Sequence, residues 1–176
     1  MKQFFKDAKG HLMTGIGYML PLIIGASLVV AIPKLIALCF GITSLDPYAD
    51  GTGVWHIMKL IENVGWTGIG MVNTVLAGFI AYSIADKPAI GAGFIGGAVA
   101  SSTYAGFLGA VIAAFIAGYS VKWAKKHIHL PESMGSVMPL VVCPLIATGF
   151  VAIIFIFILG VIGAIAVMKM SNRAKW

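Results

Sequence analysis

Charged residues are scarce in this sequence, and their scarcity excludes a water-soluble domain. Only 10% of the 176 residues are charged and 60% are hydrophobic, whereas soluble chains carry about 25% charged and about 45–50% apolar residues. The net charge of +6 does not indicate nucleic-acid binding, because the basic residues stand where hydrophobic stretches end. A soluble enzyme would have to bury all of these stretches, so we discard that class.

Cysteine is nearly absent as well. Cys39 and Cys143 are the two cysteines, too few and too isolated for a CxxC redox motif or a metal site, so we interpret both as small apolar residues. His127 and His129 lie beside a lysine cluster, but no further ligand stands at a suitable spacing. A basic loop attracted to anionic lipid headgroups is the favoured interpretation there. The sequence predicts no catalytic residue, no metal and no cofactor.

What the sequence has instead is long stretches without any Asp, Glu, Lys or Arg. Each exceeds the ~20 residues that a helix needs to cross a ~30 Å hydrocarbon core. They lack the period-2 polar alternation of a barrel wall, so helices are expected. The sequence therefore predicts an all-α integral membrane protein with a single membrane domain over residues 1–176. The stretches run from Gly10 to Pro33, Asn63 to Ala85, Pro88 to Val121 and Ser133 to Met168.

About five transmembrane or partly spanning helices are expected, at about 12–32, 66–84, 89–100, 105–123 and 145–168. Pro33 should end the first of them, because proline removes a helix donor. Residues 43–62 should form an extracytoplasmic loop with a short interfacial helix. The stretch at 88–121 is too long for one span and too short for two, so we expect a hairpin of two short helices packed through small residues. Proline at 139 and 144 should mark the entry to the final helix.

The lysines set the expected orientation. Lys2, Lys6 and Lys9 precede the first stretch, and the Lys122–Lys126 loop follows the third, so the positive-inside rule predicts a cytoplasmic amino terminus and a cytoplasmic loop at 122–126. Five crossings would leave the basic tail at residues 169–175 outside, against that bias. An interrupted protein or a misjudged hairpin would each explain this. A cleaved signal peptide is not expected, because no polar region with a small-residue cleavage site follows the first stretch.

Several segments resemble the fructose-type enzyme IIC, the membrane permease subunit of the bacterial sugar phosphotransferase system. The similarity begins at His11–Gly15 and Tyr18–Pro21, is strongest from Ala77 to Pro88 and on to Gly97, and continues through Gly106–Ala110 and Ala117–Trp123. It implies the fold of the amino-terminal half of a glucose-superfamily enzyme IIC. It also implies a multi-pass homodimer in the bacterial inner membrane that takes up fructose or a related hexose, while separate A and B units relay phosphate from phosphoenolpyruvate.

One departure from the family leaves two hypotheses open. A full enzyme IIC is longer, and its sugar-facing Gly-Ile-Thr-Glu-type motif in the carboxy-terminal half is not matched here. The chain is then either an incomplete permease, transporting sugar only with a complementary half, or a non-transporting scaffold or regulatory paralogue that dimerises through its Gly-rich helices. As a component of a sugar phosphotransferase system without a catalytic residue of its own, it is not assigned as an enzyme.

The family motifs supply the candidate site residues, which are structural or gating candidates. Asp86 and Lys87 lie at a predicted helix end, so we interpret them as a solvated turn rather than as a gating pair or a docking point for the B unit. His11 lies at the start of the first predicted span, so we expect it to cap that helix or to contact the membrane interface rather than to act in transport. Asn73 would sit mid-span, where a hydrogen bond between helices is favoured over sugar contact. The candidates are His11, Thr14, Gly15, Pro21, Asn73, Tyr82, Asp86, Lys87, Pro88, Gly93, Gly96 and Gly97.

Overall fold

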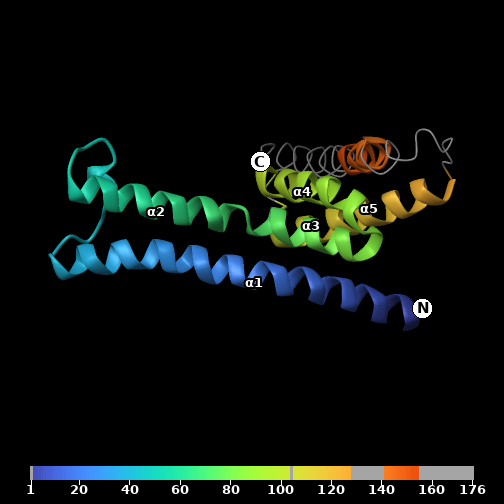
Figure 1. Cartoon of the computed structure of the whole chain (residues 1–176), viewed down its shortest axis with the longest axis horizontal. Coiled ribbons are helices and arrows are strands. Elements are labelled where there is room, and N and C mark those ends of the chain that lie inside the picture. Colours follow the sequence, from blue (N-terminus) through green and yellow to red (C-terminus); the bar gives the residue numbers. More distant parts are fainter. Residues whose placement is uncertain (1, 104, 128–140, 155–176) are drawn as a thin grey trace, which may run out of the picture.

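The computed structural model describes residues 2–103, 105–127 and 141–154, and its regular elements there are all helices (Figure 1). The elements are α1 (Lys2–Cys39), a short 3-10 helix η1 (Asp46–Tyr48), α2 (Val54–Gly70), α3 (Val72–Ala85), α4 (Lys87–Ser102) and α5 (Gly106–His127). Three helical stretches are long and apolar enough to cross a membrane, at Lys6–Cys39, Val54–Ala85 and Gly106–His127. The predicted all-α membrane fold is confirmed.

Helix α1 is longer than the sequence predicted. Its 38 residues contain both Pro21 and Pro33, so the predicted end at Pro33 is wrong. Proline is tolerated inside membrane helices because neighbouring groups can satisfy the freed carbonyls. Gly41 ends the helix instead: its φ is +78°, and the amide of Ile42 donates to the carbonyl of Ala37 at 3.0 Å. This is the left-handed Schellman termination that glycine favours.

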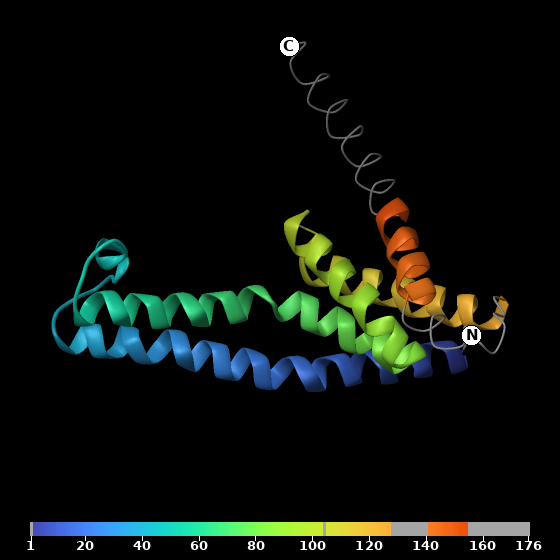
Figure 2. The same cartoon turned by 45° about the horizontal axis from the view of Figure 1, so that its top comes forward.

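Helices α2 and α3 return antiparallel along α1, as Figures 1 and 2 show. α2 begins at Val54, so the predicted loop over residues 43–62 is wrong in its second half. The break between α2 and α3 falls at Met71, inside the predicted span at 66–84. α3 ends at Ala85, one residue beyond the predicted end. Together α1 and α2–α3 make one long helical pair, and α4 and α5 pack beside the α3 end of it.

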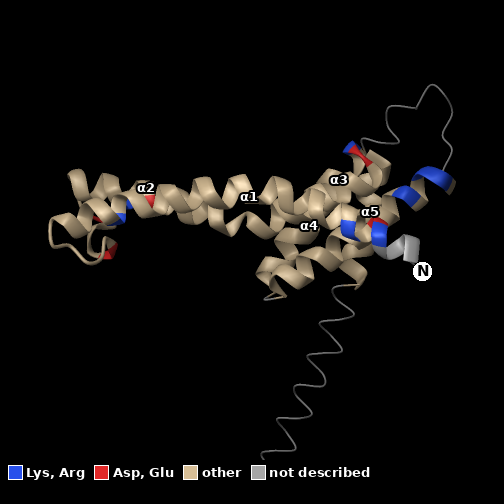
Figure 3. Ribbon diagram, turned by 90° about the horizontal axis from the view of Figure 1, so that it is seen from below, with Lys and Arg blue, Asp and Glu red and all other residues tan. Residues whose placement is uncertain are grey.

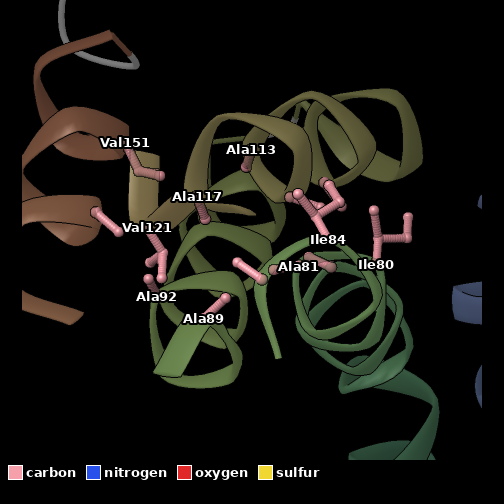
Figure 4. Packing of buried hydrophobic residues seen from close by; sticks show 14 of the residues in the cluster. Ile80, Ala81, Ile84, Ala89, Ala92, Ala113, Ala117, Val121 and Val151 are labelled. Carbon is pink, nitrogen blue, oxygen red and sulfur yellow. The ribbon is translucent and has the colours of Figure 1, made fainter. Parts of the chain in front are cut away.

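The core lies where α3 meets α1, α4 and α5, and alanine and glycine dominate it. Leu76, Ile80 and Val121 are the large side chains with no exposed surface in this cluster, and Figure 4 shows α3 and α5 residues such as Ile80, Ala81, Ile84 and Ala117 facing one another. Small residues let helix backbones approach closely in lipid, where helices gain little from apolar burial. The structure has two helices over the 88–121 stretch, α4 and α5, but α5 continues to His127, so residues 122–126, predicted as a loop, are helical.

Charged residues gather at the two ends of the elongated ribbon (Figure 3). Residues 10–33 of α1 separate the two groups, a length of about 36 Å at 1.5 Å per residue, which matches a hydrocarbon core with part of its headgroup layers. We call the two groups the basic end and the far end. Among described side chains, the basic end holds Lys6, Asp7, Lys9, Asp86, Lys87, Lys122, Lys125 and Lys126, and the far end holds Lys34, Asp46, Asp50, Lys59 and Glu62.

A last apolar helix begins at Cys143 and is described as far as Ile154. Pro144 lies in the first turn of this helix, where the amide that proline lacks would have had no partner within the helix. Its position agrees with the predicted start of the final helix. Several predicted features lie outside the described residues: the rest of the span at 155–168, the entry at Pro139, His129, and the basic tail at 169–175.

Candidate functional site

A polar break lies halfway along the helical pair. Asn73 follows the α2–α3 junction and donates from Nδ2 to Oγ of Ser101 in the last turn of α4, at 3.1 Å. Asn73 stands 11 residues after Glu62 and 13 before Asp86, about 17 Å and about 20 Å along the helices from the two charged ends. The contact between helices favoured for Asn73 is thus present, and it fixes the tip of the α4–α5 hairpin at mid-depth.

The hairpin tip exposes polar groups at this depth. Ser102 is exposed and Thr103 is half-buried, and each hydroxyl donates back to the carbonyl of Val99. α4 has 16 residues, about 24 Å, so it starts at the basic end and stops near the middle. We name residues 71–73 and 101–103 the midpoint site. Broken and partly spanning helices at mid-membrane are a recurrent feature of transporter folds.

Glycines of α4 bring three helices together at the midpoint site. A β-carbon on Gly97 would lie 2.5 Å from the carbonyl oxygen of Asn73, and one on Gly93 would lie 2.7 Å from that of Ala77, so both approach the backbone of α3. A β-carbon on Gly96 would lie 3.0 Å from Ala113 of α5. The face of α4 that carries these glycines, which the scaffold hypothesis would use for dimerisation, is therefore occupied inside the chain.

The basic end joins α1, α3 and α5. Nδ1 of His11 lies 2.7 Å from Oγ of Ser83, a contact between α1 and α3 that the sequence analysis did not propose. Nζ of Lys125 donates to the carbonyl of Ala85 at 2.7 Å, and this ammonium at the end of α3 complements the negative pole of that helix. An open cavity of about 480 Å³ lies between these three helices, beside Lys6 and His11.

The turn between α3 and α4 is sharp and open to solvent. Asp86 is the C-cap residue of α3 and the N-cap residue of α4, with φ of 61° and ψ of −160°, a backbone conformation that glycine adopts far more readily than other residues. Lys87 and Asp86 are exposed, as the solvated-turn interpretation expected, and Pro88 lies in the first turn of α4. The turn lies at the same end as Lys122–Lys126 (Figure 3).

The other candidates shape the α1–α3 contact. Gly15 packs against Ile80, and a β-carbon there would lie 3.0 Å from the carbonyl oxygen of Leu76. Thr14 donates within α1 to the carbonyl of Gly10. Tyr82 stands edge-on to Phe79, and Pro21 is an exposed residue inside α1. These placements are structural, and the transport roles of the candidates remain proposals.

An ion-pair cluster at the far end escaped the sequence analysis. Lys59 reaches Asp46 at 2.5 Å and Glu62 at 3.2 Å. The other oxygen of Glu62 accepts from Lys34 of α1 at 3.1 Å and from Nε1 of Trp66 at 3.0 Å. Glu62 is only 3% exposed, and these partners satisfy its charge. The spacing of Lys59, Glu62 and Trp66 along one helix face was the available signal.

Asp46 joins this ion-pair cluster from the connection between α1 and α2. Asp46 belongs to η1, and hydrogen bonds from Lys59 first and Ser44 second hold the pKa of its carboxyl below its ordinary value. The same bond to Lys59 ties the 40–53 loop onto α2. Nδ1 of His56 adds a 3.0 Å contact to the carbonyl of Tyr48, so this loop is fastened at two points.

Comparison with known proteins finds relatives that are named as fructose-type phosphotransferase components. The fructose-specific EIIABC component of Bacillus subtilis is 36% identical over 149 residues, 84% of this chain and 23% of that protein. The fructose-like permease IIC component 2 of Escherichia coli K12 is 33% identical over 159 residues, 90% of this chain and 42% of that protein. The chain is a relative of the fructose-type IIC components.

The relatives of this IIC-like chain differ in named substrate and in length. The 2-O-α-mannosyl-D-glycerate-specific EIIABC component of E. coli K12 is 34% identical over 91% of this chain and 24% of its own length. The chain thus spans less than half the length of each of these three relatives. No family model matches the chain, and no solved structure matches it.

Proposed function

We propose that this chain is the amino-terminal membrane part of a phosphotransferase permease, and that it moves a hexose only together with a complementary carboxy-terminal membrane part. Two observations support the proposal: the polar midpoint site at mid-depth, and the names of the relatives. In hydrocarbon, an irregular backbone is stable only where protein or a water-filled cavity covers it. The exposed hydroxyl of Ser102 and the break between α2 and α3 at Met71 lie at mid-depth, so we expect a further membrane segment to cover them.

The sugar in this proposal is fructose or a related hexose. Two of the three relatives described are named for fructose or as fructose-like and the third for a mannosyl-glycerate. A sugar contact is expected from the complementary part, where the resemblance places the family's sugar-facing motif. Asn73 is already engaged with Ser101, so the midpoint site acts as the fixed wall against which that part moves.

The A and B units belong to the same proposal. Relatives named EIIABC and EIIBC carry A or B components on the same chain as the IIC component, so separate A and B units would serve here at the cytoplasmic face. We assign the basic end to that face. Its described lysines outnumber its aspartates by six to two, whereas acidic residues outnumber lysines by three to two at the far end, and positive charge marks the cytoplasmic side.

This assignment puts the amino terminus inside and residues 46–53 outside an inner (plasma) membrane. A homodimer is expected from the resemblance. The exposed apolar side chains of α1, such as Ile24, Leu28 and Leu35, are 55–61% exposed and face either lipid or a second copy. Gly93, Gly96 and Gly97 of α4 do not serve that contact, because they pack within the chain.

Reconstituted uptake tests the proposal. The chain is co-expressed with a carboxy-terminal IIC part and with A and B units in cells that lack their own fructose permease, and uptake of labelled fructose is measured. We expect uptake that depends on phosphoenolpyruvate and stops when either membrane part is left out. Uptake that is unchanged without this chain, or that never appears although both parts reach the membrane, would refute the proposed role.

A further inference from the structure

The basic end contains two adjoining cavities that the transport proposal does not use. The first, of about 480 Å³, lies between the start of α1 and the ends of α3 and α5, and the second, of about 390 Å³, lies under the α3–α4 turn. Lys122 lines both of them. We name the two together the lysine pocket. Its size falls in the range of about 300–1,000 Å³ that small-molecule sites occupy.

The charge of the lysine pocket selects an anion. Its lining holds Lys6, Lys122, Lys125 and Lys126 against Asp7 and Asp86, an excess of two positive charges. Lys125 is anchored to the carbonyl of Ala85, so its ammonium has a fixed position at the pocket wall. Phosphate groups bind where several ammonium groups converge, because each adds a charge-assisted hydrogen bond.

The walls of the pocket are held by polar contacts between helices. His11 of α1 meets Ser83 of α3 at 2.7 Å, and Thr14 lies on the same wall. Hydroxyl and imidazole groups beside the lysines can bond the remaining oxygens of a phosphate or a glycerol. The lysine pocket is therefore formed by side chains of several helices that contact one another, not by isolated surface lysines.

An apolar cavity continues from the lysine pocket along α5. This third cavity, of about 310 Å³, is lined by Tyr119, Ser120, Trp123 and Phe150, and it shares Tyr119 with the first. Trp123 is 51% exposed and stands edge-on to Phe150. Aromatic rings at this level are typical of the membrane interface. An anionic group beside an apolar furrow matches a phospholipid: headgroup on the lysines, acyl chain on the aromatic rings.

We propose that the lysine pocket binds the phosphate headgroup of an anionic phospholipid, with Lys122 as its central ligand and the Tyr119–Trp123 furrow as the seat of an acyl chain. Basic pockets between membrane helices on the cytoplasmic side suit anionic headgroups. The bound lipid would bridge α1, α3 and α5 at the end where these helices carry the most positive charge, and would relieve the repulsion among their lysines.

Lipid titration of the whole purified chain in neutral detergent tests this inference. Phosphatidylglycerol, phosphatidylcholine and inorganic phosphate are the three probes, and retained lipid is counted by native mass spectrometry. We expect phosphatidylglycerol to bind in preference to phosphatidylcholine, and Lys122→Gln to weaken it about fivefold, the effect of one lysine at an anionic surface. Lys126→Gln is the second variant and should act in the same direction.

Lys87→Gln is the matched control, because Lys87 is an exposed lysine at the same end that lines neither cavity. It should leave phosphatidylglycerol binding within about twofold of the unsubstituted chain. An equal loss in Lys87→Gln and Lys122→Gln would overturn the site in favour of diffuse attraction. Inorganic phosphate displacing the lipid at equal concentration would overturn the lipid and leave a free phosphate site. Equal binding of the two lipids would overturn both.

Discussion

Replacing Gly97 by alanine should destabilise the packing of α4 on α3. The added β-carbon would lie 2.5 Å from the carbonyl oxygen of Asn73 and 2.7 Å from Cα of Thr74. Both are backbone atoms of the neighbouring helix, so neither can turn away as a flexible side chain could. Overpacking a tight contact costs about 1–3 kcal/mol, and a clash with backbone belongs in the upper part of that range.

Gly91→Ala provides the matched control on the same helix. Gly91 is exposed, and a β-carbon there meets nothing within 4 Å. Both substitutions reduce the freedom of the unfolded chain and favour the helix by about 1 kcal/mol, so this gain cancels in the comparison. Unfolding by SDS from neutral detergent micelles, followed by circular dichroism, should show Gly97→Ala about 1–3 kcal/mol less stable than Gly91→Ala. Equal stability of the two variants would refute the close α3–α4 approach.

Two further outcomes test other contacts. Asn73→Leu should lose about 0.6–2 kcal/mol in the same SDS titration, and adding Ser101→Ala to it should cost little more, because the bond they share is already gone; an additive loss would contradict the bond. The lowered pKa of Asp46 means that its bond to Lys59 is complete above about pH 3.8, its ordinary pKa, and is lost as the pH falls through the lower folded value. The labelling rate of a cysteine placed at Asp50 is therefore compared with the rate of the same cysteine in an Asp46→Asn chain at each pH, so that the fall of thiolate with pH cancels. The protected cysteine should be slower than its Asp46→Asn counterpart at pH 3.8 and above and should approach it below pH 3.8; a ratio that does not change with pH would contradict the assignment.

The features that could be predicted from the sequence are those that depend on local composition. The length and the small residues of the 88–121 stretch predicted the α4–α5 hairpin, because both are visible in the sequence itself. Asn73 was correctly expected to bond between helices, since an amide in mid-span needs a partner. The identity of its partner, Ser101, depends on the depth in the membrane at which the α4–α5 hairpin turns. That depth cannot be predicted from the sequence.

Features that depend on contacts between distant residues were missed. Pro33 signalled a helix end, yet the surrounding apolar environment favours continued helix, and the left-handed Gly41 ends α1 instead. Glu62 and Lys59 fell in the predicted loop, but both are buried: Glu62 pairs with Lys34 of the opposite helix, and Lys59 pairs with Glu62. These pairs allow α2 to begin before them, at Val54. The lysine pocket likewise joins Lys6 to Lys122 across most of the chain length.

Sidedness of labelling tests the membrane arrangement most directly. After replacement of Cys39 and Cys143, single cysteines are placed at Asp50, Lys87 and Lys125 and exposed in intact cells to a membrane-impermeant maleimide. The arrangement predicts reaction at Asp50 from outside, and reaction at the two lysine positions only after the membrane is permeabilised. Reaction at Lys125 from outside while Lys87 stays protected would mean that the α4–α5 segment crosses the membrane once, and would contradict the mid-depth hairpin on which the proposed function rests.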